Sequence, residues 1–307
     1  MYLSIIIPTK EREEIFKKTL AAAIDAIEDC PVEIIVVNDS KTSIPNIPGY
    51  LPNVKLINNP KSGVASARNE GVKHSIGDLL LFLDNDIIIS KESVKHIMAL
   101  HAQYPMGCFN LDWQYPQVLQ ELLTKSNLGR FILSHGMASF KGWYADGSWR
   151  DNALFESLSV ASFHLSVSKS NFDLTGGYNE QFPYAGFEDY DFPPKLKKAG
   201  LQFFIDSRVV VNHNESDRLI LDNWLANQQR RAATRKVAVN LGYHELQLEY
   251  GWIKSVVLAT IAYLHPLINF LLKSFPNHIF FDPLYFKIVA INQAAVIYKG
   301  YTSQSTT

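Results

Sequence analysis

Residues 79–89, LLLFLDNDIII, constrain the fold of this chain more than any other stretch. The apolar run predicts a buried strand, and Asp84, Asn85 and Asp86 interrupt it. Because side chains alternate along a strand, we expect Asp84 and Asp86 to point the same way and Asn85 the other. Two such carboxylates repel each other unless a cation lies between them, and Mg²⁺ or Mn²⁺ would bring a phosphate with it. A polar turn between two strands is the alternative interpretation.

The composition narrows the class of protein. With 307 residues and 47% hydrophobic residues, the chain can form one large α/β domain with an appendage. A net charge of −1 argues against nucleic acid as a partner. The two cysteines, Cys30 and Cys108, favour a reducing compartment. The apolar run at residues 3–7 is too short for a signal peptide, so we expect a first strand there.

The first forty residues predict a strand, a helix and a second strand, at residues 3–7, 14–26 and 32–37. Parallel strands joined in this way bind ligands beyond their carboxyl ends, where Thr9, Arg12 and Asp39 lie. A hydrogen bond from Asp39 to a nucleotide base or ribose is one interpretation, and a turn-capping role is the other. The chain lacks a Gly-x-Gly-x-x-Gly motif after the first strand, which disfavours a dinucleotide fold.

A helix is predicted after the small residues Gly63, Ala65 and Ser66, following a short strand at residues 54–57. The first N–H groups of such a helix favour a phosphate, and Arg68 is placed to reach the same anion or to pair with a nearby acid. A further helix is predicted at residues 91–103.

The segments SIIIPTKERE, VVNDS, GVASARNEG and LFLDND resemble, in order and spacing, the family 2 glycosyltransferases of GT-A fold. A second block at residues 172–191, with Gly-Gly-Tyr-Asn-Glu and Glu-Asp-x-Asp, is similar to the catalytic block of that family. The resemblance implies an α/β fold with a Rossmann-like mixed sheet flanked by helices. One departure is that Ser40 follows Asp39 directly, where many members have a glycine.

The resemblance also implies roles for individual residues. Asp189 matches the general base and Glu188 the residue that orients the base or the acceptor. Asp86 matches the principal metal ligand, with Asp84 and His213 as further ligands of Mn²⁺ or Mg²⁺. The residues implied to bind the nucleotide-sugar are Pro8, Thr9, Arg12, Asp39, Arg68, Asp84 and Asn85. On the acceptor side, the expectation falls on Gly177, Tyr178 and Trp149, although core packing is the stronger interpretation of any one Trp.

The last third of the chain differs in composition. We expect strands at 202–205 and 208–211 and a helix at 191–199, with residues 1–215 as the glycosyltransferase domain, divided at residue 110 into a nucleotide-sugar half and an acceptor half. Residues 216–307 form a helical extension, with helices at 217–241 and 256–272. The second of these is shorter than the roughly 20 residues of a membrane span, so we expect it to be packed or to lie on a membrane surface. Gln228 and Arg231 fit the Gln-x-x-Arg-Trp motif of processive members, but Ala232 replaces the Trp.

The resemblance implies an inverting, metal-dependent glycosyltransferase. It would move a sugar from a nucleotide-sugar, UDP-sugar favoured, to a glycan or lipid-linked acceptor in surface polysaccharide biosynthesis. We expect a cytoplasmic protein with peripheral contact at the inner face of the membrane through the C-terminal helices. A non-catalytic nucleotide-sugar-binding scaffold is a second hypothesis. A nucleotidyltransferase is a third, disfavoured because residues 8–12 lack a Gly-rich triphosphate loop.

Overall fold

The computed structural model describes residues 1–28, 30–49, 51–144, 146–182 and 184–303, which form two compact units. The first unit comprises Met1–Gln114, Ser139–Pro183 and Glu188–Asn214. The second comprises Tyr115–Ala138, Tyr184–Phe187 and Glu215–Thr307. Two segments that fall within the domain expected at residues 1–215 therefore belong to the second unit.

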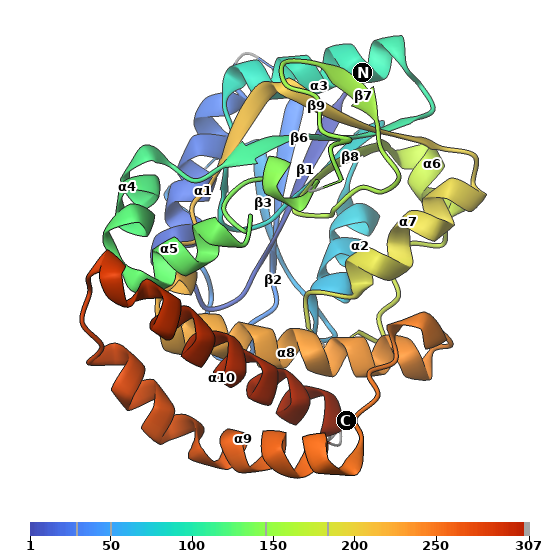
Figure 1. Ribbon diagram of the computed structural model, residues 1–307. Coiled ribbons are helices and arrows are strands. Elements are labelled where there is room, and N and C mark those ends of the chain that lie inside the picture. Colours follow the sequence, from blue (N-terminus) through green and yellow to red (C-terminus); the bar gives the residue numbers. More distant parts are fainter. Residues whose placement is uncertain (29, 50, 145, 183, 304–307) are drawn as a thin grey trace. The chain divides into compact units, whose positions relative to one another are not determined.

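A mixed sheet, with nine strands over the described residues, runs through the first unit (Figure 1). The strand order is β3-β2-β1-β4-β8-β6-β9-β5, and β7 pairs with β9. The bounds of the strands are β1 Leu3–Thr9, β2 Val32–Asn38, β3 Val54–Asn58, β4 Leu79–Leu83, β5 Ile87–Ile88, β6 Gly107–Gln114, β7 Leu154–Glu156, β8 His164–Ser168 and β9 Gln202–His213.

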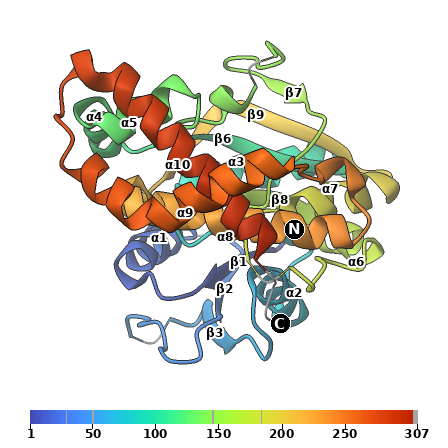
Figure 2. The ribbon, with the colours of Figure 1, turned by 60° about the horizontal axis from the view of Figure 1, so that its bottom comes forward.

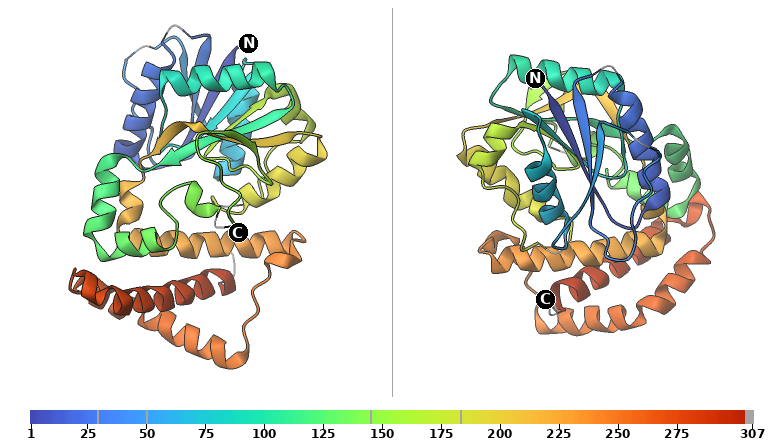
Figure 3. Two further views of the ribbon diagram at one scale, coloured as in Figure 1. Left: turned by 45° about the horizontal axis from the view of Figure 1, so that its top comes forward. Right: turned by 180° about the vertical axis from the view of Figure 1, so that it is seen from behind.

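The first four strands are mutually parallel, as the sequence predicts. Every residue of β1, β2 and β4 is buried, which fits strands covered by helices on both faces. Helices α1 (Glu13–Ala26) and α2 (Val64–His74) lie on opposite sides of these strands (Figure 3). Gly71 lets α2 approach β1 closely, because a Cβ atom there would lie 2.3 Å from Ile6 Cγ2.

The apolar run at residues 79–89 is divided between two strands, as the interruption at residues 84–86 indicates. β4 ends at Leu83, a turn follows in which the Ile87 N–H donates to the Asp84 carbonyl, and β5 leaves to pair with β9. The alternation argument for Asp84 and Asp86 fails for the same reason, because neither lies in a strand. Residues 84–86 form a polar turn between β4 and β5, and the metal-binding role of Asp84 and Asp86 stays a prediction.

The second half of the sheet is mixed in direction. β8 is antiparallel to β4 and β6, whereas β9 is parallel to β6 and antiparallel to β5 and β7. The two strands expected at 202–205 and 208–211 form one strand, β9, and the pairing with β6 shifts register after Leu111. That shift carries β9 past Asp206 and Ser207 without ending it, so the strand reaches His213.

Three further helices belong to the first unit. Helix α3 (Lys91–Gln103) has the predicted bounds, and the Ser90 side chain caps it by accepting from the Ser93 N–H. Helix α6 (Lys169–Leu174) follows β8. Helix α7 (Glu188–Lys198) begins three residues before the expected start at 191, so Glu188 and Asp189 form its first turn. A short 3₁₀ helix spans Lys141–Trp143.

The second unit is helical (Figure 2). Its helices are α4 Gln117–Lys125, α5 Asn127–Ser134, α8 Leu221–Asn240, α9 Trp252–Lys273 and α10 Asp282–Thr302, with 3₁₀ turns at Ser216–Leu219, His244–Leu246 and Ile279–Phe281. Helix α10 packs against α8, α9 and α5. Arg130 of α5 binds Asp282 at the start of α10, with Nε–Oδ2 and Nη2–Oδ1 distances of 2.6 and 2.7 Å.

The helix expected at residues 256–272 is longer than the sequence predicts. Helix α9 has 22 residues because the pattern continues through Trp252 and Lys273 at its ends. Both α9 and the segment Ile279–Thr302 are long and apolar enough to cross a membrane by length and composition. The argument from a short apolar run is therefore wrong.

Candidate active site

The turn after β4 sends its two aspartates to different partners. Asp84, with 30% of its side chain exposed, accepts from Arg68 Nη2 at 2.8 Å. Asp86 is 1% exposed and lies 2.7 Å from Arg12 Nη1 and 3.3 Å from His213 Nε2. Asn85 is tied to the first strand, donating to Thr9 Oγ1 at 3.1 Å and accepting from Arg12 Nη1.

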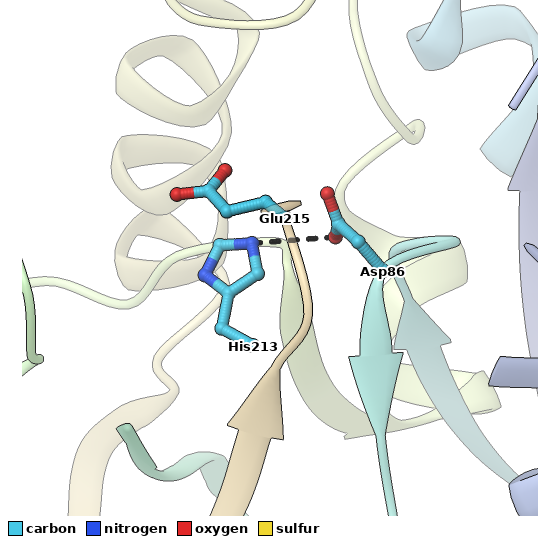
Figure 4. A group of neighbouring side chains, drawn as sticks. All are labelled: Asp86, His213 and Glu215. Atoms are coloured by element: carbon cyan, nitrogen blue, oxygen red, sulfur yellow. Dashed lines mark ion pairs between the residues drawn. The ribbon is translucent and has the colours of Figure 1, made fainter. Parts of the chain in front are cut away.

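Asp86 and His213 meet because β5 and β9 pair directly beside them (Figure 4). Ile87 is in register with His213, and the Asn214 N–H donates to the Asp86 carbonyl at 2.6 Å. The imidazole lies at the edge of Trp113, with ring centroids 4.9 Å apart. The pairing of β5 with β9 and the packing of Trp113 on His213 therefore hold the Asp86 carboxylate close to the His213 imidazole.

Glu215 is a third candidate ligand, and the sequence analysis missed it. It follows His213 by two residues, and ligand atoms of Asp86, His213 and Glu215 all lie within 4.8 Å of one another (Figure 4). Its carboxylate also accepts from Tyr115 Oη at 2.6 Å and from Arg218 Nη1 at 2.8 Å. The sequence does contain a signal for it, the tripeptide His213-Asn214-Glu215. An acid two residues after an expected metal ligand lies close enough in the chain to be a ligand of the same ion.

Arg68 is the centre of a buried cluster of charges. Its guanidinium, 1% exposed, lies 2.8 Å from Asp84, 3.1 Å from Glu188 and 3.9 Å from Asp189. Burial alone would lower the pKa of Arg68, but Asp84 and the other neighbouring acids outweigh it, so the pKa is raised and the charge is permanent. Arg68 therefore connects the end of β4 with the first turn of α7.

Tyr178 lies beneath this cluster. Its ring centroid is 5.1 Å from the Arg68 guanidinium carbon, and its hydroxyl donates to Ser162 Oγ at 2.9 Å. The ring is 3% exposed and stacks on Phe192 with centroids 4.0 Å apart. Burial raises the pKa of Tyr178 above its ordinary value. The structure thus gives Tyr178 a supporting place under Arg68.

The other residues expected on the acceptor side lie apart from one another. Gly177 has a φ of 80°, and a Cβ atom there would lie 2.7 Å from Asn69 Oδ1, so only glycine fits without a shift. Trp149 is part of an exposed segment and donates from Nε1 to Asp151 at 2.9 Å. Both remain predictions as acceptor contacts.

Asp39 organises the loop that leads into α2. Its carboxylate accepts from the Gly63 N–H at 3.0 Å and from Asn59 Nδ2 at 2.7 Å, and Lys10 Nζ lies 3.6 Å away. Thr9 and Pro8 end β1 beside this loop, paired in register with Asn38 and Val37. The residues expected to bind the nucleotide therefore gather at the carboxyl ends of β1, β2 and β4, the edge where open α/β sheets bind ligands.

Residues 4–137 match the family model described as glycosyl transferase family 2. The validoxylamine A glucosyltransferase of Streptomyces hygroscopicus subsp. jinggangensis is 25% identical over 225 residues, which cover 65% of this chain and 52% of the relative. The O-antigen biosynthesis protein RfbC of Myxococcus xanthus is 23% identical over 231 residues, covering 70% of this chain and 17% of RfbC. The chain spans less than a quarter of the length of the first two curated relatives it matches, 24% and 17%.

Solved structures show the same fold. S. aureus TarS 1-349 has a TM-score of 0.51 at 15% identity, and the match covers 98% of this chain and 91% of that one. The mannosyltransferase PcManGT from Pyrobaculum calidifontis, in complex with GDP-Man and Mn²⁺, also has a TM-score of 0.51, at 14% identity, with coverage of 94% and 73%. At these identities the likeness extends to the fold alone.

Proposed function

We propose that this chain transfers a sugar from a nucleoside-diphosphate sugar to an acceptor hydroxyl with inversion. Support comes from the match of residues 4–137 to the glycosyl transferase family 2 model and from the shared fold. The observation that carries the proposal is the meeting of Asp86 and His213 at the end of the sheet, 3.3 Å apart. The two residues are far apart in sequence, and the pairing of β5 with β9 brings them together.

The residues at this site fit a divalent cation. Carboxylate oxygens of Asp86 and Glu215 with an imidazole nitrogen of His213 form a donor set that suits Mn²⁺ better than Mg²⁺, which prefers oxygen ligands. Asp84 pairs with Arg68 and does not belong to this group of three, so it is the weakest of the proposed ligands. When bound, the cation neutralises negative charge on the diphosphate.

Asp189 is the proposed general base. It takes the proton from the acceptor hydroxyl, whose oxygen then bonds to the anomeric carbon as the bond from that carbon to the diphosphate breaks. Glu188 is 1% exposed and ion-paired with Arg68, so its proposed role is to hold Arg68 and the start of α7. Arg68 is buried among Asp84, Glu188 and Asp189, so its proposed role is to position these carboxylates.

The donor and the setting are proposed from the expected residues. Asp39, Arg12, Thr9, Pro8 and Asn85 bind the nucleotide-sugar at the strand ends, with a UDP-sugar favoured. The acceptor is a glycan or lipid-linked glycan of a surface polysaccharide, and the enzyme works on the cytoplasmic face of a membrane.

The test is a thermal-shift panel of UDP, GDP, dTDP and CMP, each with and without Mn²⁺. A ligand that binds only the folded state stabilises it by about 2.7 kcal/mol at a concentration of 100 times its Kd. We expect one nucleotide to raise the Tm of the wild type in the presence of Mn²⁺ and to have no effect on Asp86→Ala. Asp25→Ala, on the exposed face of α1, is the matched control and should respond like the wild type.

A shift that persists in Asp86→Ala would place the metal elsewhere. If no nucleotide shifts any form, the proposed donor site is wrong. A nucleotide shift without sugar transfer in a turnover assay would favour the nucleotide-sugar-binding scaffold. Release of pyrophosphate, in place of a nucleoside diphosphate, in a turnover assay would favour a nucleotidyltransferase.

A further inference from the structure

Helix α9 of the second unit buries the polar residue Asn269 together with Leu258 and Leu272, and it leaves most of its apolar side chains exposed. The inward residues His265 and Asn269 bond to Asn292 of α10, with His265 Nδ1–Asn292 Oδ1 at 2.9 Å and Asn292 Nδ2–Asn269 Oδ1 at 2.8 Å. Asn269 Nδ2 also donates to Asp222 of α8 at 2.9 Å. A helix on the surface of a soluble protein usually turns its apolar residues toward the core and its polar residues toward water.

The outward residues of α9 form a large apolar surface, which we call the α9 face. Only 17% of the most apolar 18-residue window of α9 is buried. The side chains of this face are Trp252, Ile253, Val256, Val257, Tyr263, Leu264, Leu267, Phe270 and Leu271, each between 41% and 85% exposed. The turn before α10 extends the surface with Ile279 and Phe280, which are 70% and 77% exposed. Contiguous apolar surface of this kind marks a contact with a membrane or a partner.

Charge selects the membrane as the occupant. Between residues 252 and 303 the chain carries four lysines, Lys254, Lys273, Lys287 and Lys299, and one acidic residue, Asp282. Asp282 is buried and paired with Arg130, so the exposed charges of α9 and α10 are positive. No charged residue lies between Lys254 and Lys273, which stand at the two ends of α9. Lys273 is ion-paired with Asp222 of α8, so the attraction to an anionic bilayer falls to Lys254, Lys287 and Lys299 beside the apolar face.

The hydrogen bonds of α9 argue for lying on the membrane and against crossing it. If α9 crossed alone, His265 and Asn269 would lose Asn292 and enter hydrocarbon without that partner. If α9 and α10 crossed together, Asn269 would still lose Asp222 of α8, and Asp282 would lose Arg130. Lys273 is ion-paired with Asp222, which ties the end of α9 to α8 as well. Packed on α8 and α10, the helix satisfies its polar residues and leaves the α9 face for the lipid.

We propose that the α9 face is a membrane-docking surface that binds the headgroup and acyl boundary of an anionic bilayer, with α9 parallel to the membrane plane. The proposal deepens the proposed function, because a lipid-linked acceptor lies at such a boundary, but the contact itself requires no catalysis.

Vesicle sedimentation tests the proposal with the full chain. Wild-type protein should bind phosphatidylcholine vesicles containing phosphatidylglycerol and should bind pure phosphatidylcholine vesicles less. The double variant Leu267→Glu/Phe270→Glu should bind at least about tenfold more weakly, because two apolar side chains no longer enter the bilayer. The matched control is Leu158→Glu/Leu174→Glu, two exposed leucines of the first unit, 88% and 70% exposed, which should bind like the wild type.

Three outcomes would overturn the docking surface. Equal binding by both double variants would show that the α9 face is not used. A stable dimer in light scattering that covers the face and leaves vesicles unbound would make a second copy the occupant. Protein that resists extraction by alkaline carbonate would indicate a spanning helix. The nucleotide thermal shift of Leu267→Glu/Phe270→Glu should equal that of the wild type, so a failure of docking is separable from a failure of the proposed function.

Discussion

Two buried clusters of polar residues, one in each unit, differ in what they leave at the surface. In the first unit, Arg68 is surrounded by carboxylates, and these ion pairs connect the end of β4 with the first turn of α7. In the second unit, Asn269 and Asn292 form a cluster of neutral amides with His265 and Asp222. The first cluster leaves acidic groups at a strand end, and the second leaves an apolar helix face.

The difference indicates why each cluster is buried. Charges are costly to bury, so a chain that buries Arg68 with several acids gains a fixed geometry for the groups around it. Neutral amides cost less, and they define which side of α9 packs inward. The amides therefore fix which side of α9 packs inward, and its apolar residues are left on the other side.

The largest effect expected from the first cluster is on turnover. Asp189→Asn should lower kcat by about 10²–10⁴-fold, because the amide cannot accept the acceptor's proton. Nucleotide binding, measured by the thermal shift with Mn²⁺, should be unchanged. A variant that retains wild-type kcat would remove Asp189 from the role of base and shift attention to other acids of α7.

The next largest effect is on stability. Arg68→Met leaves Glu188, 1% exposed, without its nearest cation, and breaking one side of a buried pair costs about 3–5 kcal/mol. Urea unfolding measures this loss. The control is Lys17→Met, whose pairs with Glu13 and Glu14 are exposed, so its cost should fall within about 0.5 kcal/mol. If Arg68→Met and Lys17→Met lower the free energy of unfolding equally, the acids around Arg68 must become exposed to water once the arginine is gone.

Much of the first cluster and little of the second could be predicted from the sequence. The strands before Thr9, Asp39 and Asp84 are apolar runs whose parallel order follows from the helices between them, so the site edge was predictable. The split of residues 79–89 into β4 and β5 was not, because it depends on pairing with β9, more than 100 residues away. Glu215 was missed for the same reason, because it comes close to Asp86 only through this pairing. That His265 and Asn269 point inward is shown only by their hydrogen bonds to α10.

A third effect concerns pH and the first unit. His164 on β8 is 0% exposed, and burial lowers its pKa to about 4 from an ordinary value of 6.5. Since the unfolded chain takes up the proton first, His164 favours the folded state fully above pH 6.5, and this contribution is lost as the pH falls toward 4. Between pH 7 and 5 the loss is about 2 kcal/mol.

His164→Leu should remove that share of the acid sensitivity, visible as a smaller change in the urea midpoint between pH 7 and 5. His101 of α3 has a pKa lowered to about 4 by burial as well, so a smaller slope should remain in the variant. An unchanged slope would mean that His164 stays neutral in both states or reaches water when folded.

The smallest effect should come from replacing the amide cluster as a whole. Asn292→Leu alone leaves the Asn269 oxygen without its donor, a cost of about 1–3 kcal/mol. The double variant Asn269→Leu/Asn292→Leu removes both amides and leaves the part-exposed His265 and Asp222 to bond water. It should therefore recover most of that loss, to within about 1 kcal/mol of wild type. The Arg68 cluster should show no such recovery in Arg68→Met/Glu188→Gln, since Asp84 and Asp189 still face the lost cation. If both double variants recover the same share of the free energy of unfolding, the charged cluster and the amide cluster do not differ energetically.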